Sequence, residues 1–196
     1  MPDAHSAFGV VSSLVRRKPW DLIATTQDWH PRDHVSFAAT HRAAVFSTRD
    51  VPLPGSAHPV AQVMWPTHCV QHTRGADIHP TVGDALAHAR AHGVPIHHVY
   101  KGCDARVDSY SGFADNTCVQ STDLERALRA ARISSVVICG LATDYCVRAT
   151  ALDAAKRGFD TAVCTDAARG VDAQSAAHAL DAMRAAGCRM LTSVDV

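Results

Sequence analysis

The sequence predicts an α/β fold in which a parallel sheet carries helices on both faces, a three-layer αβα arrangement. Two observations support this prediction. Short apolar runs that are typical of buried strands alternate with longer helix-like stretches. Glycine follows several of the helix-like stretches, at the place where helices commonly end. Strands that are separated by helices pair in parallel, because each crossover returns the chain to the same end of the sheet.

The expected elements follow one another along the whole chain. Strands are predicted at residues 21–26, 94–100, 134–139, 159–165 and 188–192. Helices are predicted at residues 81–92, 123–132, 144–157 and 174–186, and the N-terminal stretch is typical of a short amphipathic helix that leads into the first strand. The stretch 27–80 has little regular periodicity and is rich in His, Pro and Trp. Because long irregular segments of compact domains are usually functional, we expect a ligand site there.

Length and composition indicate a single domain, residues 1–196, and exclude several classes of protein. Hydrophobic residues make up 47% of the 196 positions and charged residues 19%, which allows a buried core. The 19 Lys and Arg residues balance 19 Asp and Glu residues, whereas binders of nucleic acids or anionic membranes need a basic face. No apolar run approaches the roughly 20 residues of a membrane span. We therefore expect a small-molecule partner.

The cysteines indicate a reducing compartment. Seven is an odd number, no two are spaced as CxxC, and several lie in apolar runs, so we expect free thiols. The N-terminal stretch lacks the basic region of a secretory signal, which favours a cytoplasmic protein. The 13 histidines outnumber Phe, Trp and Tyr together. They favour a chemical site, because His binds metals and moves protons near neutral pH.

A candidate metal site follows the first predicted strand. Asp28 and His30 are two residues apart, so their side chains point the same way from extended backbone. A carboxylate and an imidazole in this arrangement suit a divalent metal such as Zn, Fe or Mn. His34 and His68, in the same long segment, are candidates for completing the site.

Two further candidates follow later strands, at the edge where open parallel sheets bind ligands. Lys101 ends the strand at 94–100, where a cation would stabilise a thiolate or an oxyanion. Cys146 follows the strand at 134–139 and falls in the first turn of a helix that Thr143 would cap. Free amides and the helix dipole lower the pKa of a thiol at such a place. Amides of the turn would also act as oxyanion donors.

Four separated motifs together resemble the nicotinamidase/pyrazinamidase branch of the isochorismatase-like cysteine hydrolases. The motifs are QDWHPRDHVSF at 27–37, WPTHCV at 65–70, KG at 101–102 with DSYSGF at 108–113, and GLATDYCV at 140–147. The resemblance covers about the whole chain from residue 7 onward. The metal-loop residues separate this branch from metal-free relatives that keep only the Lys and the Cys.

The resemblance implies an isochorismatase-like fold and a metal-dependent nicotinamidase that converts nicotinamide to nicotinic acid and ammonia in NAD salvage. Cys146 would be the nucleophile that forms a thioester, and Lys101 would hold its thiolate. The amides of Ala142 and Cys146 would form the oxyanion hole, and the peptide bond between Leu141 and Ala142 would be cis.

The resemblance also implies how metal and substrate are held. Asp28, His30 and His68 would bind one divalent ion, Zn, Fe or Mn, which in turn binds the pyridine nitrogen. His34 stands where only some members have a fourth ligand. Trp65 and Tyr110 would sandwich the aromatic ring. The implied partner is nicotinamide, and assembly into a homo-oligomer is left open.

One family feature has no counterpart in this sequence. The family begins with an apolar strand that ends in an Asp, which orients the Lys and takes the thiol proton. This strand lies at the centre of related sheets, between the strands here at 21–26 and 134–139. Asp3 and Asp21 are the only acids before the metal loop, and neither is placed to substitute. We expect an N-terminally truncated domain whose sheet lacks its first central strand, with low stability and little amidase activity.

Two other functions stay open. The absent Asp favours a catalytically impaired pseudoenzyme or fragment that keeps the ligand pocket, whereas the intact Cys146 and Lys101 argue against it. The second is another isochorismatase-like cysteine hydrolase, acting on an N-carbamoyl or isochorismate-like substrate. The metal-loop residues argue against this reading, because a metal there would have no ring nitrogen to bind.

Overall fold

Among the residues that the structure describes, the parallel strands form two separate hydrogen-bonded groups. The computed structural model describes residues 3–17 and 19–196. Its parallel strands are β1 (Ile23–Asp28), β4 (Ile96–Lys101), β5 (Ser135–Leu141), β6 (Asp160–Arg169) and β7 (Arg189–Leu191). β1 pairs with β4, and the other three pair in the order β5–β6–β7, all in parallel. The parallel arrangement predicted from the alternation of elements is confirmed.

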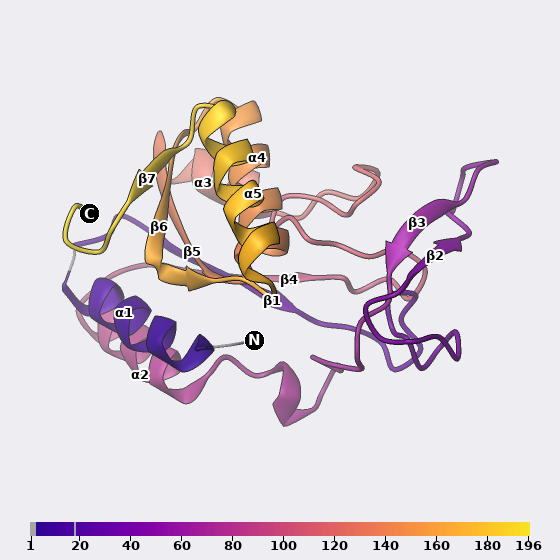
Figure 1. Ribbon diagram of the computed structural model, residues 1–196. Coiled ribbons are helices and arrows are strands. Elements are labelled where there is room, and N and C mark those ends of the chain that lie inside the picture. The colour runs from indigo at the N-terminus through magenta and orange to yellow at the C-terminus, as the bar shows by residue number, and fades with distance from the viewer. Residues whose placement is uncertain (1–2, 18) are drawn as a thin grey trace.

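Helices cover both faces of these strands. They are α1 (Ala4–Arg17), α2 (Pro80–Ala91), α3 (Leu124–Ala130), α4 (Arg148–Lys156) and α5 (Ala173–Ala185). In β6, Val163 packs into a cluster with Ala151 of α4 and Met183 of α5, while the next residue, Cys164, packs with Leu14 of α1. Successive side chains of a strand point to opposite faces, so α1 lies on one face and α4 and α5 on the other (Figure 1). The three layers are those that the sequence predicts.

The segment 27–80 contains structure that the sequence did not reveal. β2 (Thr48–Val51) and β3 (Val60–Val63) form an antiparallel hairpin that projects away from the parallel strands (Figure 1), and a short 3-10 turn spans Arg74–Ala76. The hairpin strands are four residues long, and only Val51 and Gln62 are buried in them. Strands this short, with mostly exposed side chains, show too little hydrophobic periodicity to be predicted from the sequence.

The predicted helix at 144–157 begins differently from the prediction. Residues Thr143–Val147 form a π-helical turn, and α4 continues from Arg148. Ala142, which is extended, stands at the cap position, and no side chain caps this turn. The prediction that Thr143 is the N-cap is therefore wrong by one residue. Single π turns often occur at functional sites.

A gap separates β1 from β5. Each of these strands is paired on one side only, β1 with β4 and β5 with β6. β6, which is paired on both sides, buries residues 161–164, whereas β5 has no fully buried residue. The resemblance places the family's first strand between these two strands. No helix within residues 3–17 or 19–196 is both long and apolar enough to cross a bilayer.

Candidate active site

The carboxyl ends of β1, β4 and β5 bring three predicted residues together. Asp28 ends β1 and Lys101 ends β4, and the two residues are partners in the register of this strand pair. Cys146 lies in the π turn that follows β5. Strands that run in parallel end at one edge, which is why residues so distant in sequence meet there.

Lys101 is the centre of this group. Its side chain is 3% exposed, and its Nζ forms an ion pair with Asp28. The same Nζ donates to the backbone oxygen of Ser109 at 2.8 Å and lies 3.4 Å from Cys146 Sγ. Burial alone would lower the pKa of Lys101, but the negative charges of the Cys146 thiolate and Asp28 outweigh burial and raise it. Lys101 is therefore a fixed cation beside the thiol.

The backbone around Cys146 is sharply bent. The peptide bond between Leu141 and Ala142 is cis, as the resemblance implies, and Gly140 has a φ of 116°. Burial raises the pKa of the Cys146 thiol, and the positive charge of Lys101 acts in the opposite direction. The expectation of a lowered pKa is not met, because desolvation of the thiolate exceeds the stabilisation that it receives.

Asp144 anchors the turn that carries Cys146. Its side chain is buried, and its carboxylate accepts hydrogen bonds from the backbone N–H of Val171 at 3.0 Å and of Asp172 at 3.2 Å. It also accepts one from the Ser175 hydroxyl at 2.5 Å. These bonds join the turn to the start of α5. Sequence reasoning missed this role, because the donors lie 27 to 31 residues away.

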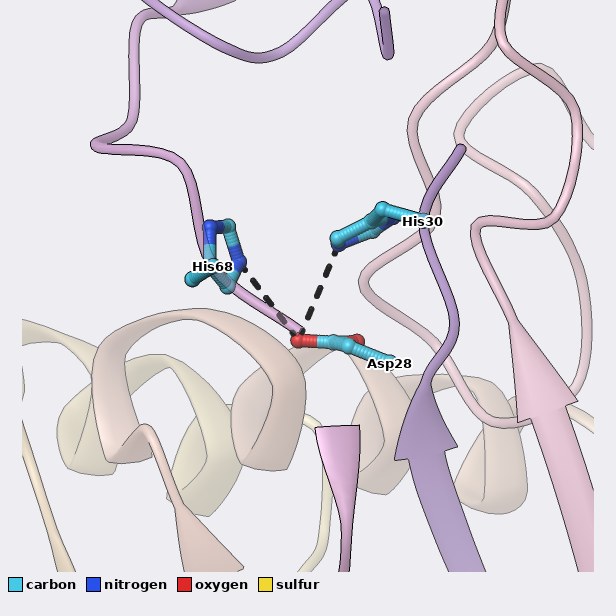
Figure 2. A group of neighbouring side chains, drawn as sticks. All are labelled: Asp28, His30 and His68. Carbon is cyan, nitrogen blue, oxygen red and sulfur yellow. Dashed lines mark ion pairs between the residues drawn. The ribbon is translucent and has the colours of Figure 1, made fainter. Parts of the chain in front are cut away.

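Two histidines turn the same nitrogen toward one carboxylate (Figure 2). The Nε2 atoms of His30 and His68 lie 4.0 Å and 3.8 Å from Asp28 Oδ2. The Nδ1 atoms face the carbonyl oxygens of Gly102, at 2.9 Å, and of Pro66, at 2.8 Å. A carbonyl can only accept, so Nδ1 carries the hydrogen and Nε2 keeps a free lone pair. Metal-binding histidines are commonly oriented in this way.

The charge state of these groups suits a divalent cation. Burial opposes ionisation of Asp28, but Lys101 and His30 outweigh it and lower the pKa of Asp28, which stays a carboxylate. Burial lowers the pKa of His30 despite the opposing charge of Asp28, so the imidazole is neutral. One carboxylate and two imidazoles, with donor atoms within 4.8 Å of one another, fit Zn, Fe or Mn.

His34 lies behind His30 and outside this triad. The two rings stack with centroids 4.1 Å apart. His34 Nδ1 hydrogen-bonds the Ser36 hydroxyl at 2.8 Å, while its Nε2 is buried without a hydrogen-bond partner among the described residues. Burial and the nearby His30 lower the pKa of His34 to about 4. A second possible donor group is formed by His34, His30 and the buried carboxylate of Asp108.

Trp65 and Tyr110, the predicted aromatic pair, are in contact, but their ring planes are not parallel. Trp65 Nε1 donates to the Tyr110 hydroxyl at 3.2 Å, and the rings meet edge-on with centroids 6.5 Å apart and planes at 85°. Tyr145, which the sequence reasoning missed, lies 4.6 Å from Trp65 and 5.4 Å from Tyr110. Its place directly before Cys146 is the signal that could have found it. The three half-buried rings contact one another and form one aromatic group.

Gly102 allows the backbone to approach His30 closely. It has a φ of 63°, and a Cβ atom there would lie 2.4 Å from His30 Cε1. Real Cβ atoms do not come so near another atom, so only glycine fits this position. The glycine of the Lys101-Gly102 pair therefore positions a proposed metal ligand.

This arrangement defines the class of protein. A buried lysine lies beside a cysteine on a bent turn, and a possible metal-binding triad lies next to them. All of these groups lie at the carboxyl edge of parallel strands. Such an arrangement is typical of an enzyme active site. The family model of the isochorismatase domain matches residues 32–195, and the chain belongs to that family.

Several relatives that match most of this chain are nicotinamidases. The nicotinamidase of Escherichia coli K12 is 38% identical over 199 residues, covering 100% of this chain and 87% of the relative. A nicotinamidase/pyrazinamidase structure from Acinetobacter baumanii superposes with a TM-score of 0.84 at 35% identity, covering 98% and 86% of the two chains. A zinc complex of the Pyrococcus horikoshii pyrazinamidase gives a TM-score of 0.72 at 29% identity, covering 98% and 88%.

Proposed function

We propose that this protein is an amidohydrolase that converts nicotinamide to nicotinic acid and ammonia through a thioester on Cys146, with a divalent metal, as a step of NAD salvage in the cytoplasm. The single observation that carries the proposal is the distance of 3.4 Å between Lys101 Nζ and Cys146 Sγ, at the edge where His30 and His68 flank Asp28. The names of the relatives that match the chain support the choice of substrate.

Cys146, as its thiolate, attacks the carboxamide carbon in the first half of the reaction. The new C–S bond replaces the C–N bond, and the proton from Sγ leaves with the amide nitrogen as ammonia. Lys101 stabilises the thiolate from which attack begins. In the second half, water cleaves the thioester, which releases the carboxylic acid and restores the thiol.

Backbone and aromatic groups would act on the rest of the substrate. The N–H groups of Ala142 and Cys146 are the proposed donors to the oxyanion that forms on the carbonyl oxygen. Trp65 and Tyr110 would bind the flat ring, and Tyr145, which contacts both of them, would add a third aromatic contact. Such rings offer apolar contact and edge-to-face packing to a heteroaromatic substrate.

Asp28, His30 and His68 would hold the metal. A bound divalent ion would supply an electrophile that the pyridine nitrogen can ligate, which fixes the orientation of the ring. The orientation of both histidines through Nδ1, described above, supports this ligand set. Because Ser36 occupies Nδ1 of His34, the unpartnered Nε2 is the atom that His34 would offer to a metal.

Ammonia release from nicotinamide tests this proposal. The zinc-loaded protein should form ammonia and nicotinic acid in equal amounts, at the low rate expected where the family's first acid has no counterpart, and the Cys146→Ala variant should form neither. Isochorismate and an N-carbamoyl amino acid, tested in parallel, should give no product. Turnover of either compound in place of nicotinamide would point to a different cysteine hydrolase of the family.

A second candidate function is binding without turnover. The raised pKa of Cys146 and the gap beside β5 favour it, because both reduce the supply of an ordered thiolate. Calorimetric titration with nicotinamide separates the two functions. Saturable heat without ammonia release identifies a ligand-binding pseudoenzyme, whereas turnover identifies the amidohydrolase.

A further inference from the structure

The hairpin β2–β3 packs loosely against the segment 104–117, which carries Tyr110. A cavity of about 160 Å³ lies between them, and its lining includes Val51 and Val60 of the hairpin and Val107 of the segment. Apolar side chains hold two segments together through close packing, and a cavity of this size reduces that packing. Other contacts therefore hold the hairpin in place beside the proposed site.

Gln62 of β3 supplies these contacts. The residue is 5% exposed, and its Nε2 donates to Asp108 Oδ2 at 2.8 Å and to the backbone oxygen of Val63 at 2.9 Å. The same nitrogen lies 3.4 Å from the Tyr110 hydroxyl. A carboxylate and a carbonyl can only accept, so the nitrogen of the amide faces them. Among the described residues, no other hydrogen bond joins the hairpin to the segment that carries Tyr110.

Two donors hold the Tyr110 hydroxyl. One is Gln62 Nε2, and the other is Trp65 Nε1, at 3.2 Å. An amide nitrogen and an indole N–H can only donate, so the hydroxyl oxygen accepts from both. Burial and the charge of Asp108 raise the pKa of Tyr110, so the hydroxyl also keeps its own hydrogen. Gln62 thus helps to fix the position of Tyr110 relative to Trp65, the other ring that is proposed to bind the substrate.

The Asp108 carboxylate extends this network to Lys101. Its Oδ2 accepts from Gln62, and its Oδ1 accepts from the backbone N–H of Ser109 at 2.8 Å. The backbone oxygen of Ser109 in turn accepts from Lys101 Nζ at 2.8 Å. Asp108, Ser109 and Lys101 are each 4% exposed, so bulk water does not compete for these bonds. One amide of the hairpin is therefore connected both to the aromatic pair and to the cation beside Cys146.

We propose that Gln62 is a positioning residue for the substrate ring, a role that rests on the proposed function. It acts through Asp108 and Tyr110, because it holds the loop 108–110 at the place where the Tyr110 ring meets Trp65. Without the Gln62 donor, this loop moves relative to Trp65. The ring of the substrate is then bound more weakly, whereas the chemical step on bound substrate, which uses other groups, is affected less.

Hydrogen exchange of the ligand-free protein tests the effect of Gln62 on the loop. Gln62→Met keeps the length of the side chain and removes the donor. We expect amide exchange of residues 108–111 to become about tenfold faster, and exchange of α4 to stay the same. Gln174→Met, at an exposed position of α5, is the matched control and should change neither. Equal exchange of the loop in the two variants, or faster exchange throughout the molecule, would overturn the proposal.

Nicotinamide binding separates positioning from an effect on folding. In a protein that also carries Cys146→Ala, Gln62→Met should raise the calorimetric Kd for nicotinamide about tenfold, the size typical of losing a hydrogen bond to a charged group. In the protein that keeps Cys146, KM should rise by a similar factor, and kcat should change less than roughly threefold. A role in stability alone would lower the folded fraction, which reduces the apparent kcat and leaves KM and Kd unchanged. That result would contradict the proposal.

A reciprocal change of the two side chains tests the contact between Gln62 and Asp108. Gln62→Glu removes the donor and places a second carboxylate beside Asp108, so it should weaken nicotinamide binding more than Gln62→Met does. Adding Asp108→Asn restores one donor and one acceptor at these positions with the net charge of the unaltered protein. We expect the double variant to bind nicotinamide more tightly than Gln62→Glu. No recovery would overturn the role assigned to this contact. If Gln62→Met does not fold, Gln62→Asn replaces it in every measurement.

These readouts distinguish the role of Gln62 from the proposed function. Exchange of the ligand-free protein requires neither binding nor catalysis. Faster exchange of the loop in Gln62→Met, together with no ammonia release by the unaltered protein, would support the position assigned to Gln62 and contradict the amidohydrolase. Ammonia release by the unaltered protein, with the same loop exchange, Kd and KM in Gln62→Met and Gln174→Met, would support the amidohydrolase and overturn the role of Gln62.

Discussion

Lys101 Nζ lies 3.4 Å from Cys146 Sγ and also forms an ion pair with Asp28. One buried cation thus links the proposed nucleophile to a proposed metal ligand. Replacing Lys101 should therefore affect the thiol and the acid together, and a distant lysine should affect neither.

Lys101→Met should make the thiol less reactive. The Lys101 charge lowers the pKa of Cys146 against the effect of burial, so its removal raises that pKa further. The thiolate fraction at pH 8 then falls, and the pH at which iodoacetamide alkylates Cys146 moves upward. We expect kcat/KM for nicotinamide to fall by about 10²–10³, the size typical of losing one electrostatic contact to a developing charge. Lys156→Met, at an exposed position, is the control. An unchanged alkylation profile in Lys101→Met would contradict this role.

Metal binding should depend on the oriented histidines. Titration of the protein with zinc, followed by calorimetry, should show one site per chain. His68→Ala removes one of three ligands and should weaken zinc binding at least tenfold, whereas His58→Ala, an exposed residue outside the site, should leave it unchanged. Lowering the pH should release the metal, because protons compete for the two imidazoles. Equal zinc affinity of both variants would rule out this triad.

Gly102→Ala should destabilise the protein and disturb the metal site. The added Cβ would lie 2.4 Å from His30 Cε1, and the φ of 63° disfavours any side chain. We expect a loss of roughly 1–3 kcal/mol in urea unfolding, the range for strained backbone at a functional site. Gly83→Ala is a matched control, because Gly83 lies in α2 with open space around it. That change should stabilise the helix by about 0.5–1 kcal/mol. If both variants lose the same stability, the close approach to His30 has no special cost.

Asp144→Ala should loosen the turn that carries Cys146. It removes the acceptor for two backbone N–H groups and the Ser175 hydroxyl. A buried donor without a partner costs about 1–3 kcal/mol, so the midpoint of urea unfolding should fall clearly. Asp181→Ala, at a side chain that is 73% exposed and bonded to Arg184, should shift it little. Equal midpoints would show that Asp144 does not anchor the turn.

Much of the fold follows from local patterns in the sequence. The apolar runs predicted all five parallel strands within a few residues. Parallel strands must end at one edge, so the sequence alone places Asp28, Lys101 and Cys146 at the same edge of the sheet. The hairpin β2–β3 could not be predicted, because strands of four residues with one buried side chain each leave no periodic signal.

The parts of the site that the sequence did not reveal depend on contacts between distant segments. The close approach of Gly102 to His30 and the bonds from Asp144 to the start of α5 join residues far apart in sequence. The thiol pKa was misjudged for a similar reason. A helix start lowers the pKa of a cysteine, but the depth of burial, which has the opposite effect here, is set by the whole fold.

The most direct test of the account is an acid-quenched mass measurement during the reaction with nicotinamide. The zinc-loaded protein should carry one nicotinoyl group, and peptide mapping should place it on Cys146. The Cys146→Ala variant should carry none and release no ammonia. Ammonia release by that variant at the rate of the unaltered protein, or a nicotinoyl group on any other residue, would contradict the proposed role of Cys146.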